Sequence, residues 1–152
     1  MRPNHPQGLL LQIDAIELYQ EKGSQEEVLE GKKTLATRYG EYLAYWATND
    51  HYGFQEYLIR SDSSMAERID TYVITTLEEL GRYYHHLAQQ NKDPLQYEEA
   101  IKWYLTFLRT FFQNPKSPEI NFLLAEALNE DHRYGEAIRE YEKTSYNYAV
   151  SL

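Results

Sequence analysis

The chain has 152 residues, of which 42% are hydrophobic and 26% are charged, and its formal net charge at pH 7 is -9. This length is sufficient for one domain with a hydrophobic core, or for a short stack of repeated units. The acidic balance argues against nucleic acid and anionic membrane surfaces as main partners, because both require clustered Lys and Arg. The chain contains no cysteine, which excludes disulfides, thiolate zinc sites and a cysteine nucleophile.

The first residues predict neither a signal peptide nor a membrane span. The leucine run at residues 9–11 is soon interrupted by Gln12 and Asp14, so the segment is too short and too polar for either role. We therefore expect no direct membrane insertion. The compartment stays open at this point, because a chain without cysteine suits reducing and oxidising surroundings alike.

The first half of the chain predicts helices of irregular spacing. Residues 13–40 read as a hairpin that turns at Gly23-Ser24, where Ser24 is an N-cap and Glu27 completes a capping box. Residues 41–50 and 52–62 are expected to form shorter helices. The only stretch with strand character, residues 71–76 (TYVITT), lies inside a longer helical pattern.

Helix boundaries are clearly marked in the second half. Asp93 and Pro94 have the residue types of an N-cap and a first helical position, and Ser117 and Pro118 repeat this pattern. Pro115 ends the helix that precedes it. Four helices are expected, over about residues 64–91, 94–112, 118–129 and 134–147. We therefore predict an all-α fold with an irregular helical half, residues 1–76, and a half of two helical hairpins, residues 77–152.

Two stretches of the second half repeat each other 37 residues apart. Gln96–Phe107 (QYEEAIKWYLTF) and Arg133–Thr144 (RYGEAIREYEKT) both have an aromatic residue, two spacers, Ala-Ile, two spacers and Tyr. The helix before each copy also has a matching Leu, a small residue and a larger apolar or aromatic one. The aligned positions are Leu80, Gly81, Tyr84, Tyr97, Ala100 and Tyr104 in the first copy, and Leu124, Ala125, Leu128, Tyr134, Ala137 and Tyr141 in the second. The first copy has the longer turn between its helices.

The small residues have a mechanical reason. Two antiparallel helices approach most closely where neither carries a bulky side chain, and the flanking Leu and Tyr side chains fill the space beside that contact. We expect Ala137→Leu to overpack such a contact, and Glu140→Leu, on the exposed side, to have little effect. The aromatic residues expected to serve packing are Tyr84, Tyr97, Tyr104, Tyr134, Tyr141, Trp46 and Trp103.

This pattern resembles the tetratricopeptide repeat family, whose 34-residue helix-turn-helix units have Leu-Gly/Ala-x-x-aromatic in the first helix and Tyr-x-x-Ala-x-x-x-aromatic in the second. The resemblance covers about residues 77–148 and implies a right-handed superhelix of antiparallel helix pairs. A weaker third unit is expected around Ile16, Tyr19 and Val28. The ending of the helix over residues 94–112 is similar to extended repeats of bacterial envelope proteins, which suggests the envelope or periplasm if the chain is a fragment.

The resemblance also predicts an uncovered end. A helical solenoid needs a terminal helix with a polar outer face, but here the second unit is followed only by a short tail. The exposed tail is expected to include Tyr141, Tyr146, Tyr148, Val150 and Leu152. We expect either that the chain is part of a longer repeat array or that the tail pairs with another copy of itself.

The sequence predicts no catalytic, metal or cofactor site. His85 and His86 are adjacent, and neighbouring helical residues point about 100° apart, which is unfavourable for binding one metal ion. We expect both histidines to be solvated. The pairs Asp50-His51 and Asp131-His132 are typical of turns, and no phosphate-binding loop or His-Glu-x-x-His motif is present. A carbohydrate-binding surface built from the 15 tyrosines is a weaker reading than packing.

The family resemblance implies a non-catalytic protein–protein interaction or scaffold module, in which the first helix of each pair lines a concave groove. The groove residues implied by the register are Glu78, Arg82, His85, His86, Phe122, Glu126, Asn129 and Glu130. Such an acidic, partly aromatic groove suits a protein or peptide segment with Lys or Arg and an apolar anchor. It does not suit the terminal carboxylate of a chaperone. The alternatives are that these are ordinary solvated positions, and that the uncovered hairpin makes a homo-oligomer without a peptide ligand.

Overall fold

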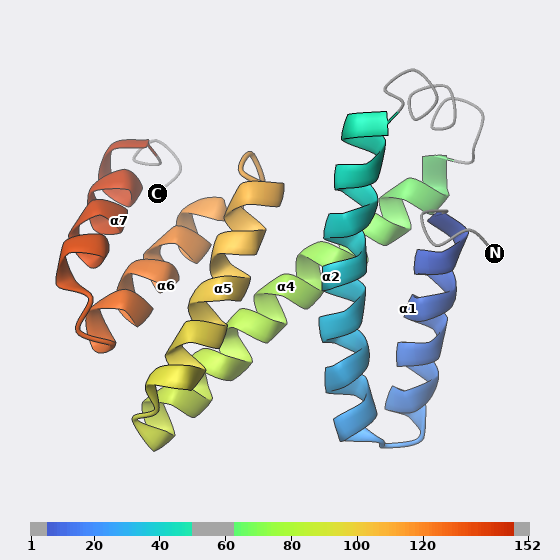
Figure 1. The fold of residues 1–152 in the computed structure, drawn as a ribbon, viewed down its shortest axis with the longest axis horizontal. Coiled ribbons are helices and arrows are strands. Elements are labelled where there is room, and N and C mark those ends of the chain that lie inside the picture. The colour runs from blue at the N-terminus through green and yellow to red at the C-terminus, as the bar shows by residue number, and fades with distance from the viewer. Residues whose placement is uncertain (1–5, 50–62, 148–152) are drawn as a thin grey trace. The chain divides into compact units, whose positions relative to one another are not determined.

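The structure, a computed structural model, describes residues 6–49 and 63–147, and within these ranges it is helical without a strand (Figure 1). The prediction of an all-α fold is confirmed. The chain divides into two compact units, Met1–Thr76 and Leu77–Leu152, so that the boundary falls within one long helix, α4. The helices are α1 (Pro6–Glu21), α2 (Gln25–Asn49), α4 (Ser63–Asn91), α5 (Pro94–Thr110), α6 (Ser117–Glu130) and α7 (Tyr134–Asn147).

In the first unit, α1 and α2 form an antiparallel hairpin (Figure 1). The predicted turn is confirmed, and Gly23 adopts a φ of 73°, which a glycine accepts without strain. The prediction of a separate short helix at residues 41–50 was wrong, because α2 continues through Gly40 to Asn49. No proline follows Gly40 in this helix, and a single helical glycine costs only about 1 kcal/mol relative to alanine.

The first half of α4 is joined to this hairpin by polar contacts. The Tyr39 hydroxyl donates to Asp70 Oδ1 at 2.6 Å, and Arg68 Nη2 lies 2.9 Å from Asp14 Oδ1. Burial, together with the hydrogen bond to Asp70, raises the pKa of Tyr39 well above its usual value. The apolar core of the unit includes Leu9, Ile13, Ile16, Leu35, Ile69 and Val73. The side chain of Trp46, the pair Asp50-His51 and the helix expected at residues 52–62 lie outside the described part.

In the second unit, α6 packs against both α5 and α7. The four predicted helices are confirmed to within two residues at each end. The Asp93 side chain caps α5 by accepting from the Leu95 backbone N–H at 3.0 Å. The cap predicted at Ser117 was wrong: Lys116 holds the N-cap position, and the buried Ser117 hydroxyl donates to the Phe111 carbonyl at 2.8 Å. That bond satisfies a carbonyl beyond the end of α5.

The small residues of the repeat lie in the interior of this unit, as expected. Ala100 and Ala125 are fully buried, Ala137 is 2% exposed, and Gly81 lies directly against the ring of Tyr104. Among the predicted packing aromatics, Tyr97, Tyr104 and Trp103 are buried, whereas Tyr84 and Tyr141 are half-buried. The prediction failed for Tyr134, which is 54% exposed.

The predicted exposure of Glu140 was also wrong. Its side chain is 14% exposed and accepts a hydrogen bond from Asn121 Nδ2 at 2.6 Å, so it belongs to the contact between α6 and α7. Asn121 Oδ1 in turn accepts from the buried Thr144 hydroxyl at 2.7 Å. These side chains form a polar cluster within the packed interface, in which the hydrogen bonds offset the loss of water.

None of the helices described here is sufficiently long and apolar to cross a lipid bilayer.

Candidate binding surface

The eight predicted groove residues form two sets of four at equivalent positions of α4 and α6, 44 residues apart. Glu78, Arg82, His85 and His86 lie on α4, and Phe122, Glu126, Asn129 and Glu130 are their counterparts on α6. The structure gives the two sets different surroundings. Three members of the α4 set contact α6 or the residue before it, whereas two members of the α6 set contact α7.

The first contact region is a row of ion pairs, which we call the α4–α6 seam, made of Glu78, Arg82, Lys116 and Glu119. Glu78 lies 2.7 Å from Lys116 Nζ and 3.0 Å from Arg82 Nε, and Arg82 Nη2 lies 2.6 Å from Glu119 Oε1. Partial burial by itself raises the pKa of the Glu78 carboxyl, but the hydrogen bonds from Lys116 and Arg82 outweigh it, so the pKa is lowered. These charges therefore satisfy one another within the unit.

His85 belongs to the interior. It is 6% exposed, so the expectation that it is solvated was wrong; His86, one position further, is exposed. His85 Nε2 lies 2.8 Å from Glu130 Oε2, and Nδ1 lies 3.0 Å from the Tyr104 hydroxyl. In the neutral ring, the carboxylate requires the proton on Nε2, so the Tyr104 hydroxyl donates to Nδ1. Gln89 Nε2 also donates to Glu130, at 3.0 Å.

Sequence reasoning missed the partners of these residues, namely Lys116, Glu119, Gln89 and Tyr104 in its polar role. The first two lie at the beginning of α6, where a basic residue and an acidic one stand three positions apart. A search for charges complementary to Glu78 and Arg82 in the next first helix would have found them.

The α6 set is arranged differently. The Phe122 ring is 45% exposed and contacts the Tyr141 ring, with centroids 6.1 Å apart and an interplanar angle of 63°. The Tyr141 hydroxyl donates to Glu126 Oε1 at 2.9 Å, and Asn129 is exposed one turn further along α6. Burial, the hydrogen bond to Glu126 and its charge raise the pKa of Tyr141 to about 12.

The equivalent residues of α5 and α7 differ strongly in exposure. Tyr97 and Ile101 on α5 are each 4% exposed, whereas their counterparts Tyr134 and Ile138 on α7 are 54% and 56% exposed. The reason is that α6 packs against α5, while within the described part of this unit no further helix covers α7 in the same way. We call the resulting surface the terminal face. It consists of Phe122, Glu126, Asn129, Tyr134, Ile138 and Tyr141.

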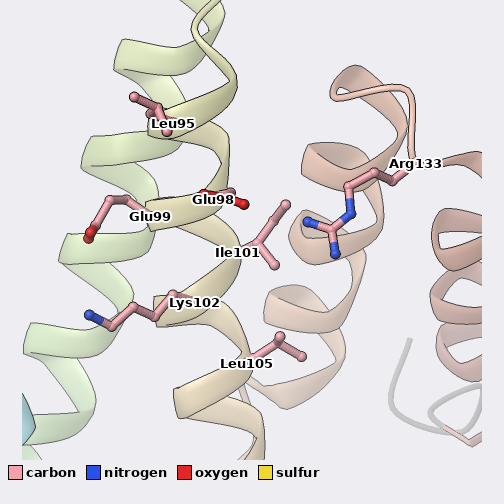
Figure 2. Close-up of a pocket in the computed structure, with 7 residues that line it drawn as sticks. All are labelled: Leu95, Glu98, Glu99, Ile101, Lys102, Leu105 and Arg133. Carbon is pink, nitrogen blue, oxygen red and sulfur yellow. The ribbon is translucent and has the colours of Figure 1, made fainter.

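A separate hollow of about 510 Å³ lies beside α5. Figure 2 shows Ile101, Leu105 and Arg133 pointing toward one another across the space between α5 and the turn before α7. Glu99 and Lys102 lie on the opposite side of α5. The hollow is wide open, and Arg133 is bound to Glu136 at 2.7 Å. It therefore lacks the enclosure and the convergent polar groups of a small-molecule site.

Within the residues that the structure describes, no group of three or more His, Asp or Glu side chains is arranged to hold a metal ion. Comparisons with protein-family models, curated proteins and solved structures give no match to the chain.

Proposed function

We propose that the chain is a helical-repeat module of the tetratricopeptide type, which binds a protein partner without catalysing a reaction. Two features support this proposal. The repeated positions of the second unit place small residues in buried helix contacts, and the terminal face exposes the large apolar side chains of Phe122, Tyr134 and Ile138. The surface that binds the partner in this proposal is the terminal face.

The observation that carries the proposal is the exposure of Tyr134 and Ile138. Both are more than half exposed, although the repeat places them where Tyr97 and Ile101 are buried under a helix. Phe122, 45% exposed, adds a third large apolar side chain. A contiguous apolar patch bordered by polar groups is typical of a protein-interaction surface, and aromatic residues are enriched in the cores of such surfaces.

The proposal assigns to the binding surface only some of the residues of the predicted groove. Glu78, Arg82, His85 and Glu130 are engaged with residues of their own unit, so a partner would have to break those contacts before using them. The members that remain available to a partner without such a cost include Phe122 and Asn129, which belong to the terminal face. His86 is exposed but lies outside this patch.

A helical-peptide display selection against the full chain tests the proposal. Ile138→Ser should lower the affinity of the chain for the selected peptides by at least about fivefold, since truncating a central interface side chain costs roughly 1 kcal/mol or more of binding free energy. Leu95→Ser is the matched control, because Leu95 is an exposed leucine on α5, 71% exposed, that does not belong to the terminal face. A selection without binders, or equal losses in both variants, would refute the proposal.

Self-association is the second candidate, and the same exposed side chains favour it. If the terminal face pairs with another copy, the chain will form dimers or longer assemblies that Ile138→Ser disrupts. Light scattering over a concentration series separates the two functions. A monomer at every concentration would eliminate self-association and leave the binding proposal intact.

A further inference from the structure

We propose that the terminal face binds one amphipathic helix of a different protein, with a Lys or Arg opposite Glu126 and an apolar side chain opposite Phe122. This inference rests on the proposed function and specifies its partner. Its basis is α6, because α6 is a helix already seated on the corresponding face of α4 and α5.

The contacts of α6 define how a helix sits on that face. Lys116, at the beginning of the helix, pairs with Glu78, and Glu119, three positions later, pairs with Arg82. At the far end, Glu130 accepts from His85. Between these ends, Ile120, Leu124 and Ala127 are fully or almost fully buried and lie on one side of the helix by their spacing.

The terminal face has different chemistry at the same positions. The counterpart of Glu78 is Phe122, and the counterpart of Arg82 is Glu126. A helix seated in the same register must therefore replace Lys116 by an apolar residue and Glu119 by a basic one. Glu126 retains the capacity for this pair, because the Tyr141 hydroxyl bonds only to Oε1 and a carboxylate has a second oxygen.

The far end of the face keeps its preference for an acceptor. On the first face, His85 and Tyr97 both bond to the Glu130 carboxylate. Of their counterparts, Asn129 can donate through its side-chain amide, whereas the Tyr134 hydroxyl already lies 2.7 Å from Nδ1 of His132. The partner helix thus combines an apolar residue, a base three positions later, a central apolar stripe and an acceptor near its end.

The charge distribution distinguishes this partner from a second copy of the chain. The exposed apolar residues of α1, Leu11 and Leu18, offer an alternative helix, but α1 contains Asp14 and other acids and no Lys or Arg. Pairing two terminal faces about a twofold axis would leave Glu126 of each face without a basic partner, because the face contains no Lys or Arg. With a net charge of -9, the chain favours a basic helix from another protein.

The test uses two synthetic peptides and the full chain. One peptide, called the basic probe for the single Lys that it places opposite Glu126 of the chain, is the sequence of residues 116–130 carrying Lys116→Leu and Glu119→Lys, and the control peptide is the unchanged sequence. Fluorescence anisotropy should show the basic probe binding at least about fivefold more tightly. The Glu126→Lys variant should reverse this preference, whereas Glu98→Lys, a charge reversal at an exposed position of α5, should leave it unchanged.

The outcomes separate the inference from the proposed function. Equal binding of both peptides, or a preference that Glu126→Lys does not alter, overturns the basic-helix inference. If neither peptide binds, the inference also fails, and the display selection decides independently whether the face binds another class of segment. A dimer that Ile138→Ser dissociates would show that a second copy occupies the face, which overturns the inference as well.

Discussion

Gly81→Ala tests the close contact between α4 and α5 at the centre of the second unit. A Cβ atom at position 81 would lie 2.4 Å from Cε1 and 2.5 Å from Cδ1 of Tyr104, whereas ordinary contacts begin near 3.4 Å. The ring or the helix must therefore move by about 1 Å. Tyr104 is fully buried, and its hydroxyl is bound to His85 Nδ1 at 3.0 Å, so the ring has little room to yield.

The expected change in the free energy of unfolding is the sum of two opposing contributions. Overpacking of this kind costs about 2–3 kcal/mol at a rigid site. Alanine in place of a helical glycine returns about 1 kcal/mol. The expected net loss is therefore about 1–2 kcal/mol, which lowers the melting temperature of a unit of this size by about 5–15 °C.

Thermal unfolding followed by tryptophan fluorescence measures this loss. A Trp46→Phe background leaves Trp103, which is buried in the second unit, as the reporter. Gly135→Ala is the matched control, since its nearest neighbour would be the end of the Arg139 side chain at 4.0 Å. Adding Tyr104→Leu should remove the penalty in a double-mutant cycle. Equal stability of Gly81→Ala and Gly135→Ala would refute the account of the contact.

Three further predictions concern the same unit. Ala137→Leu should lose about 1–3 kcal/mol in chemical denaturation because Ala137 is 2% exposed, and a comparable loss for the exposed control Ile138→Leu would contradict the packing assignment. The lowered pKa of Glu78 contributes stability that is complete above the ordinary pKa of 4.5 and is lost as the pH falls through the lowered pKa. Glu78→Gln should therefore flatten the dependence of the unfolding free energy on pH in the acid range. An unchanged pH profile would contradict a contribution of the α4–α6 seam to stability. Asp93→Ala removes a helix cap and should cost about 1 kcal/mol, whereas Asp93→Asn should retain most of the stability in urea unfolding.

Local sequence signals predicted the helices well where their chemistry is local. Asp93 caps α5 because its carboxylate reaches a backbone N–H two residues away, and that contact depends on nothing distant. Ser117 carries a similar signal, but its hydroxyl bonds to Phe111, and its burial is decided by tertiary packing. The same distinction explains Gly40, where a possible breaker is absorbed into a long helix.

Burial at the candidate surface could not be predicted from the repeat, because identical motifs acquire different neighbours. Tyr97 and Tyr134 have the same place in the motif, yet among the helices that the structure describes one packs over Tyr97 and none packs over Tyr134. Similarly, the local sequence predicts a solvated His85, but Glu130, 45 positions away, supplies the hydrogen-bond partner that makes the burial of His85 favourable. The spacing of a motif determines the local structure of one helical hairpin, whereas the exposure of its side chains depends on which helices pack against that hairpin.

The α4–α6 seam has a consequence for how the chain assembles. Duplicated units carry the hazard that a helix docks on the wrong copy, and misassembly between similar units is a known failure of repeat proteins. Here Lys116 and Glu119 are opposite in charge to their partners Glu78 and Arg82, but at the terminal face they would meet the Phe122 ring and the like charge of Glu126. An α6 helix from a second chain that docked on the terminal face would therefore lose both ion pairs and place Glu119 beside Glu126, which favours docking of α6 within its own chain.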